Sequence, residues 1–226
     1  MAELPRLGMN HISARVISTN RCADAFGAMF WAFLFFLDFG IGFNGVTLDI
    51  LPDIVGWLLM LSALKAIPDL SPDVRPLRTL ALWLAVLSLF SLIQIKGASG
   101  TGVTGLTIVY TLHYLFTAIL ELIYIWMLCG LIMGMGLAYR CAALAERADF
   151  RRKFYAILQL SFLVLPGILM IINDRALVIA TAIVGFLIYA ILFCLMMGLM
   201  KATQKMCIGC VEINALANAH IYQRNL

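Results

Sequence analysis

Apolar residues along this chain form six long, nearly continuous runs separated by short polar segments. A helix that crosses about 30 Å of hydrocarbon needs roughly 20 apolar residues, because each residue adds about 1.5 Å. The runs suit that length and do not alternate apolar with polar positions, as the strands of a transmembrane barrel would. We therefore predict an all-α integral membrane protein, a bundle of six transmembrane helices at residues 25–43, 50–67, 77–95, 105–137, 154–172 and 176–200.

The fourth run is longer than a bilayer is thick. Residues 105–137 would make a straight helix of about 50 Å, which exceeds the hydrocarbon thickness. Two spans joined by a turn would fit that length, but they would move the basic cluster Arg151, Arg152 and Lys153 to the outer side. We predict instead one long helix that tilts or projects beyond the bilayer, which leaves six spans.

Basic residues predict the orientation of the bundle. With the N-terminus inside, 14 of the 16 Lys and Arg residues fall in inner segments, and only Lys96 and Arg175 fall outside. Such an excess of Lys and Arg is typical of short cytoplasmic loops. Both termini are therefore predicted to be cytoplasmic, in the cytoplasmic membrane of a bacterium. The predicted divisions are a cytoplasmic arm at 1–24, a transmembrane domain at 25–200 and a cytoplasmic tail at 201–226.

Composition excludes several other classes of protein. Hydrophobic residues make up 63% of the 226 residues and charged residues only 12%, about half the charged share of a soluble domain. Disordered chains and nucleic-acid-binding proteins need more charge or less hydrophobicity, so neither class fits. The net charge of +4 reflects the topology. The predicted partners are the lipid bilayer and either another membrane protein or a second copy of this chain, without nucleic acid.

Ionisable residues within the predicted spans are candidates for function, because burying them in a bilayer costs free energy. Asp38 lies in the first span, and His113, Thr117 and Glu121 follow one another at helical spacing in the fourth. Two further aspartates stand at the outer mouth of the second span. No Lys or Arg lies within a predicted span. The candidate path for protons or a small cation is formed by Asp38, Asp49, Asp53, His113 and Glu121.

Structural roles can explain the same residues. Asp49 can cap the second helix and Asp53 can favour its dipole, while Pro52 is tolerated in the first turn. His113 and Glu121 can form hydrogen bonds between helices, worth about 1 kcal/mol each. The sequence alone leaves both interpretations open.

Metal and enzyme signatures are weak. Cys207 and Cys210 have metal-like spacing, but a structural zinc needs four ligands and no second pair lies nearby in the sequence. No phosphate-binding loop or histidine–glutamate metalloprotease motif is present. Ser99, in a Gly-rich segment, has no histidine on a different span to activate it. We therefore predict no cofactor and no catalytic residue, and we do not favour an enzyme.

The start of the second predicted span also carries a resemblance. The letters FFLD at 35–38, followed by DILPDIVGW at 49–57, resemble a pattern in multi-pass bacterial membrane proteins that have an early aspartate and an ILPD-x-x-G entry to the second helix. The likeness covers roughly residues 31–67. That family has no assigned activity, so the resemblance implies no catalytic residues. It implies a special role for the region from Asp38 to Gly56.

Two functions fit these observations. The first is a small transporter or channel-like protein that moves protons, a cation or a small solute. The alternative is a non-enzymatic accessory, assembly or sensor subunit that acts through helix–helix contacts. A transporter requires Asp38, His113 and Glu121 to face one hydrated cavity. An accessory subunit would instead present small residues and polar contacts on an outer face.

Overall fold

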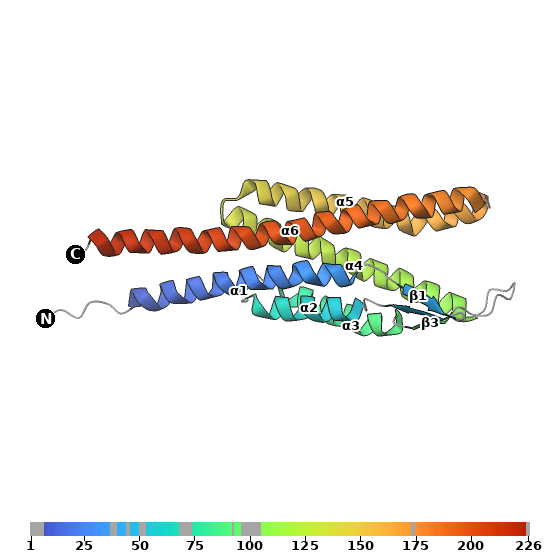
Figure 1. Cartoon of the computed structure of the whole chain (residues 1–226), viewed down its shortest axis with the longest axis horizontal. Coiled ribbons are helices and arrows are strands. Elements are labelled where there is room, and N and C mark those ends of the chain that lie inside the picture. Colours follow the sequence, from blue (N-terminus) through green and yellow to red (C-terminus); the bar gives the residue numbers. More distant parts are fainter. Residues whose placement is uncertain are drawn as a thin grey trace.

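The computed structural model describes residues 7–36, 40–43, 46–49, 53–67, 74–91, 93–95, 105–172 and 175–224. Helices dominate these ranges, which confirms the predicted helical class. The helices are α1 (Leu7–Phe35), α2 (Asp53–Ala66), α3 (Val74–Ser91), α4 (Gly105–Ala138), α5 (Ala142–Ile172) and α6 (Arg175–Arg224) (Figure 1).

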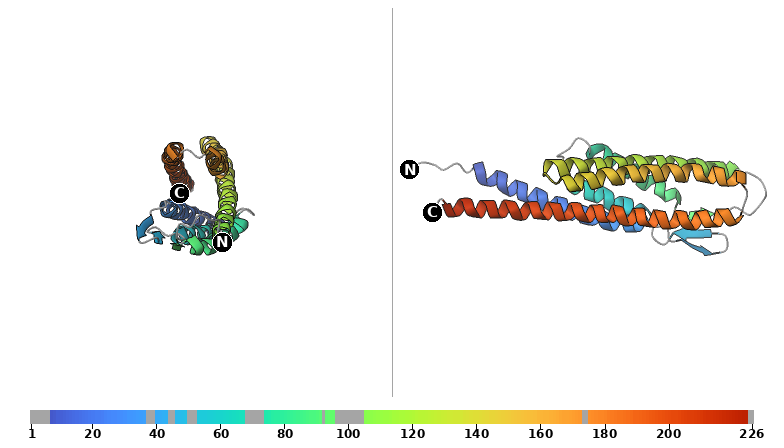
Figure 2. Two further views of the ribbon diagram at one scale, coloured as in Figure 1. Left: turned by 90° about the vertical axis from the view of Figure 1, so that its right-hand side faces the viewer. Right: turned by 90° about the horizontal axis from the view of Figure 1, so that it is seen from above.

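The helices follow one another around a ring in chain order. Each helix packs against the next, and α6 returns to pack against α1. Helix α4 runs obliquely from the side of α3 to the side of α5, and the beginning of α1 and the end of α6 lie at the same end of the molecule (Figure 1 and Figure 2). An up-and-down ring of this kind turns one face of every helix toward a shared interior.

A small antiparallel sheet, which was not predicted, lies at the opposite end (Figure 1). Its strands are β1 (Gly40–Phe43), β2 (Val46–Asp49) and β3 (Ile93–Ile95), in the order β1-β2-β3. In its register Val46 is paired with Phe43 on one side and with Ile95 on the other.

The sheet shortens two of the predicted helices. Helix α1 ends at Phe35 and α3 ends at Ser91, short of the predicted ends at 43 and 95. The β-branched residues of these segments, among them Val46 and Ile95, favour strands. Apolar content alone does not distinguish a helix end from a short strand, which is why the sequence pattern missed the change.

Helices α4, α5 and α6 are longer than the spans predicted within them, whereas α2 (Asp53–Ala66) is shorter than the predicted span 50–67. Residues 105–138 form one continuous helix, as predicted for the fourth run. Helix α5 includes residues 142–153, which were predicted to link two spans. Helix α6 continues through most of the predicted tail, and α1 begins at Leu7 within the predicted arm. Most of the two predicted cytoplasmic ends therefore continues helices of the bundle.

A tight turn joins α4 to α5. Arg140 has a φ of 57°, and the Cys141 amide donates a hydrogen bond of 2.7 Å to the Gly136 carbonyl. A Cβ at Gly136 would lie 3.1 Å from the Ala145 backbone nitrogen, so the glycine permits the two helices to approach. A left-handed residue just after a helix is a common way to satisfy its last carbonyls.

The hydrophobic core fills the ring close to the level of the basic residues. Every helix contributes buried apolar side chains there, including Phe26, Met60, Leu77, Leu128, Leu144 and Leu199. Farther toward the sheet, large apolar side chains of α4, α5 and α6 are exposed, among them Phe116, Leu160 and Phe186.

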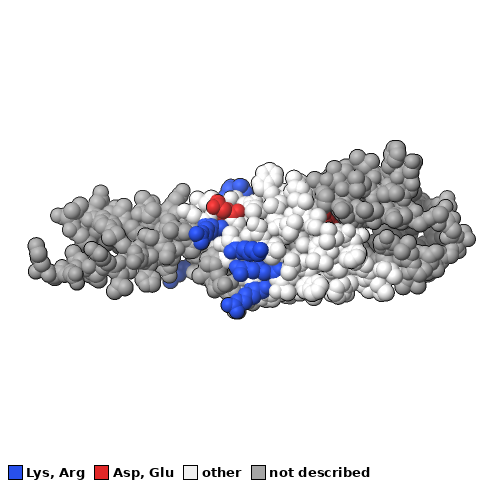
Figure 3. Space-filling view, turned by 90° about the horizontal axis from the view of Figure 1, so that it is seen from below, with Lys and Arg blue, Asp and Glu red and all other residues white. Residues whose placement is uncertain are grey.

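The described Lys and Arg side chains gather in a band across one face of the molecule (Figure 3). Within it, Asp149 accepts hydrogen bonds of 2.9 Å from Arg152 and 2.6 Å from Lys153. The hydrogen bond from Lys153 is the main reason that the pKa of Asp149 is lowered. The band is thus a mixed-charge surface with an excess of positive charge.

Two helical stretches of the described chain are long and apolar enough to cross a membrane. They are Thr111–Ala138 in α4 and Ile183–Cys210 in α6, judged by length and composition. Large apolar side chains are also exposed on all six helices, for example Trp31 on α1, Leu58 on α2 and Trp83 on α3. Exposed apolar surface of this extent is typical of contact with a membrane or a protein partner.

Arg78 ties α3 to the end of α2. Its Nε donates a hydrogen bond of 3.0 Å to the Leu64 carbonyl, and its second terminal nitrogen donates one of 3.0 Å to the Ile67 carbonyl. The last carbonyls of a helix have no partner within the helix, so a guanidinium at this position satisfies them.

We expect Arg78→Met to lower the free energy of unfolding in detergent by about 1–3 kcal/mol, because hydrogen bonds from a charged donor would be lost and the carbonyls left unpaired. Methionine keeps the aliphatic stem and removes the donors. Arg75→Met, at an exposed position in the same turn of α3, is the matched control and should change stability little. Equal losses in the two variants would contradict the capping role.

Candidate functional site

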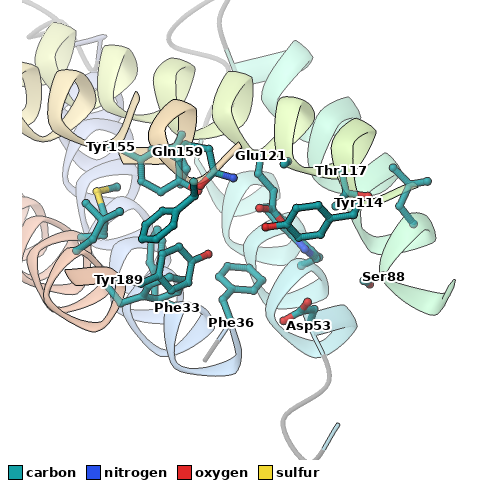
Figure 4. Close-up of a pocket in the computed structure, with 18 of the residues that line it drawn as sticks. Phe33, Phe36, Asp53, Ser88, Tyr114, Thr117, Glu121, Tyr155, Gln159 and Tyr189 are labelled. Carbon is teal, nitrogen blue, oxygen red and sulfur yellow. The ribbon is translucent and has the colours of Figure 1, made fainter. Parts of the chain in front are cut away.

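A cavity of about 670 Å³ lies inside the ring of helices, on the sheet side of the core. All six helices contribute residues to its lining. A volume of this size falls within the range of about 300–1,000 Å³ that is typical of sites for small molecules. Figure 4 shows its walls, with side chains from different helices directed into the same space.

Three of the five predicted site residues line this cavity. Asp53 reaches it from the first turn of α2, and His113 and Glu121 reach it from α4. Asp38 lies outside the described residues, and Asp49 belongs to β2, where its side chain is not described. The structure thus brings together residues from two helices that are far apart in the sequence.

The polar stripe of α4 forms one wall. His113, Thr117 and Glu121 all line the cavity, as their helical spacing predicts for residues on one face. The Thr117 hydroxyl is buried without a hydrogen-bond partner. Tyr114 also lines the cavity, and its side chain points toward Glu121 (Figure 4). The groups that this wall presents to the cavity therefore include an imidazole, a phenol and a carboxyl group.

Gly56 sets the position of Asp53 relative to α1. A Cβ at Gly56 would lie 2.5 Å from the Phe36 ring and 3.0 Å from the Ala32 carbonyl oxygen. The absence of a side chain therefore lets α2 pack closely on α1. Asp53 lies one turn earlier on α2, where its charge also favours the helix dipole. The predicted structural role of Asp53 and its place in the cavity are compatible.

A continuous chain of aromatic rings, which was not predicted from the sequence, forms much of the remaining wall. Consecutive ring centroids along it are separated by 4.5–6.2 Å, within the range for interacting aromatic pairs. This chain of rings links α5, α6, α1 and α2 through Phe162, Tyr189, Phe193, Phe33, Phe36 and Trp57. All six rings line the cavity.

The cavity lining is acidic in its formal charges. Its described residues include Asp53 and Glu121 but no Lys or Arg. Ser88, Gln159 and Tyr155 add uncharged polar groups. The basic side chains instead belong to the band that crosses the molecule near the middle of its length (Figure 3). This separation of charge makes the cavity attractive to a positively charged species.

The predicted metal candidates lie elsewhere. Cys207 is buried and Cys210 is half-buried, and both belong to the continuous helix α6. Among the described residues, no group of three or more His, Cys, Asp or Glu side chains could hold a metal ion. The described residues therefore do not assemble a metal site around this pair.

Comparison with protein-family models, with curated proteins and with solved structures finds no match to this chain.

Proposed function

We propose that this chain is a six-span membrane protein with both termini cytoplasmic, and that it is a small transporter or channel-like protein for protons, a cation or a small solute. The observation that carries the proposal is the joint position of Asp53, His113 and Glu121 at one cavity. Acids held within a helical ring, with no Lys or Arg in the described lining, can bind and release a cation or a proton.

The distribution of side chains supports a bilayer around the ring. Apolar side chains are exposed on every helix, while basic side chains form a band across the molecule near the middle of its length (Figure 3). A multi-pass protein of a bacterial cytoplasmic membrane would place this band at the cytoplasmic surface. Helices α4 and α6 provide the two stretches that are individually apolar enough to cross.

This orientation places the cavity relative to the two surfaces of the membrane. The lining residues of α6 run from Gly185 to Met196 and precede Lys201 of the basic band, so the cavity lies on the outer side of the band. Buried side chains such as Leu128 and Leu199 close the cytoplasmic side. We propose that a solute enters from the outer side, and that passage to the cytoplasm requires this core to repack.

The proposal is tested by flux into proteoliposomes that hold the purified protein. Proton flux is followed with an internal pH indicator, and sodium or potassium flux with a cation indicator, each against protein-free liposomes. We expect flux above the protein-free level for at least one of these ions. Flux at the protein-free level for all three would contradict the transport of protons and small cations, and would leave a small solute as the transported species.

A further inference from the structure

We infer that the cavity takes an organic cation with an apolar body, and that this molecule is the solute of the transporter. The inference rests on the proposed function and narrows it to one class of substrate. Its basis is the juxtaposition, inside one cavity, of two carboxylates with a continuous chain of aromatic rings.

The cavity has a polar end and an aromatic end. Glu121, Tyr114 and Asp53 lie toward one end, whereas Phe33 and Tyr189 lie toward the other (Figure 4). A ligand that fits both ends must carry a polar group and an apolar part. Because the charged groups at the polar end are acids, the complementary polar group is a cation.

The aromatic rings favour the same class of ligand. A cation within about 6 Å of a ring face is attracted by the ring quadrupole, and quaternary ammonium groups are commonly held in this way. The rings of Phe36, just after α1, and of Trp57, on the helix that carries Asp53, have centroids 4.5 Å apart. The walls can therefore stabilise both the charge and the apolar body of an organic cation.

The size and chemistry of the cavity argue against a bare inorganic ion as the main ligand. Such an ion is bound by several oxygen ligands at short distance, and rings cannot replace that shell. No group of three or more potential metal ligands occurs among the described residues. A volume of about 670 Å³ is also far larger than one ion needs. It suits a molecule with several rings or a branched hydrocarbon body.

The test is equilibrium binding to the purified full-length chain in nanodiscs, with protein-free nanodiscs as the blank. The two probes are tetraphenylphosphonium and tetraphenylborate, which share size and shape and differ in the sign of their charge. We expect saturable binding of the phosphonium above the blank and none of the borate. Absence of saturable phosphonium binding, or equal binding of both ions, would overturn the inference.

Variants locate the bound cation. Glu121→Gln should weaken phosphonium binding by roughly tenfold or more, because the carboxylate charge is lost. Phe186→Leu changes an exposed ring of the lining and should weaken it about threefold to thirtyfold, since leucine keeps the apolar volume but not the ring. Phe150→Leu, an exposed ring on α5 outside the lining, is the control and should leave binding unchanged. Unchanged binding in Glu121→Gln would overturn the inference.

Flux measured on the same preparation separates this inference from the function on which it rests. Ion flux without phosphonium binding would overturn the organic-cation inference and leave a transporter of protons or small ions. Phosphonium binding that depends on Glu121, without any flux of ions or of phosphonium, would uphold the site and contradict transport.

Discussion

Glu121→Gln is expected to reduce cation or proton flux to near the level of protein-free liposomes. Glu121 lies on the cavity wall of α4, and its side chain points toward the space shared with Asp53 (Figure 4). Glutamine keeps the shape of the side chain but can neither carry the negative charge nor release a proton. Losing a charged interaction of about 2–3 kcal/mol in an enclosed site would slow transport by roughly 30-fold to 150-fold.

The matched control is Glu146→Gln, which removes an exposed carboxylate of α5 outside the cavity lining. It should transport at the wild-type rate. Asp53→Asn is expected to impair flux as well, because it removes the second acid of the cavity. If Glu121→Gln and Glu146→Gln transported equally well in correctly folded protein, Glu121 would have no part in the path.

Gly56→Ala is expected to lower the free energy of unfolding in detergent by about 1–3 kcal/mol. The added methyl group would collide with the Ala32 carbonyl oxygen and the Phe36 ring, at 3.0 Å and 2.5 Å. The ring can turn, but the carbonyl belongs to the backbone of α1, so the two helices must separate. We therefore also expect weaker ligand binding, because Asp53 would shift relative to α1.

Gly134→Ala serves as the control for this second prediction. Gly134 lies in α4 with no atom within 4 Å of the position that its Cβ would occupy. The same substitution there adds helix propensity of about 1 kcal/mol without a collision, so stability should stay the same or rise. If the two alanine variants had equal stability, the close packing of α2 on α1 would be wrong.

The helices and one wall of the cavity could be predicted from the sequence. Long apolar runs have few structural alternatives in a chain with so little charge. The spacing of His113, Thr117 and Glu121 requires them to share a face of any regular helix, and all three line the cavity. Asp53 was predicted with two roles, and its position in the first turn of α2 allows both.

The aromatic wall could not be predicted in the same way. Its rings come from four helices, and no local spacing reveals that they meet. The pairs Phe33 with Phe36 and Tyr189 with Phe193 have helical spacing, but the same pattern is common wherever aromatic residues pack in a core. Their convergence depends on the return of α6 to α1, which closes the ring.

The strands also escaped prediction for a physical reason. Residues 40–43 and 93–95 continue apolar runs, and hydrophobicity does not say where a helix stops. The resemblance at residues 31–67 indicated a special role for this region. That role stays a prediction. The structure shows only that Gly56, within this region, allows α2 to approach α1. Asp38 lies outside the described residues, so its part in the path stays a prediction.

The most direct test is the charge selectivity of thiol modification at Thr117→Cys, because Thr117 belongs to the cavity lining and lies on the same face of α4 as Glu121. Membrane-impermeant reagents carrying a trimethylammonium or a sulfonate group are added to right-side-out and to inside-out vesicles. Wild-type protein gives the background from its native cysteines. We expect the thiol at position 117 to be modified from the outer side, at least about tenfold faster by the cationic reagent than by the sulfonate. Faster reaction with the sulfonate, or no reaction above background from either side, would contradict an acidic cavity that opens outward.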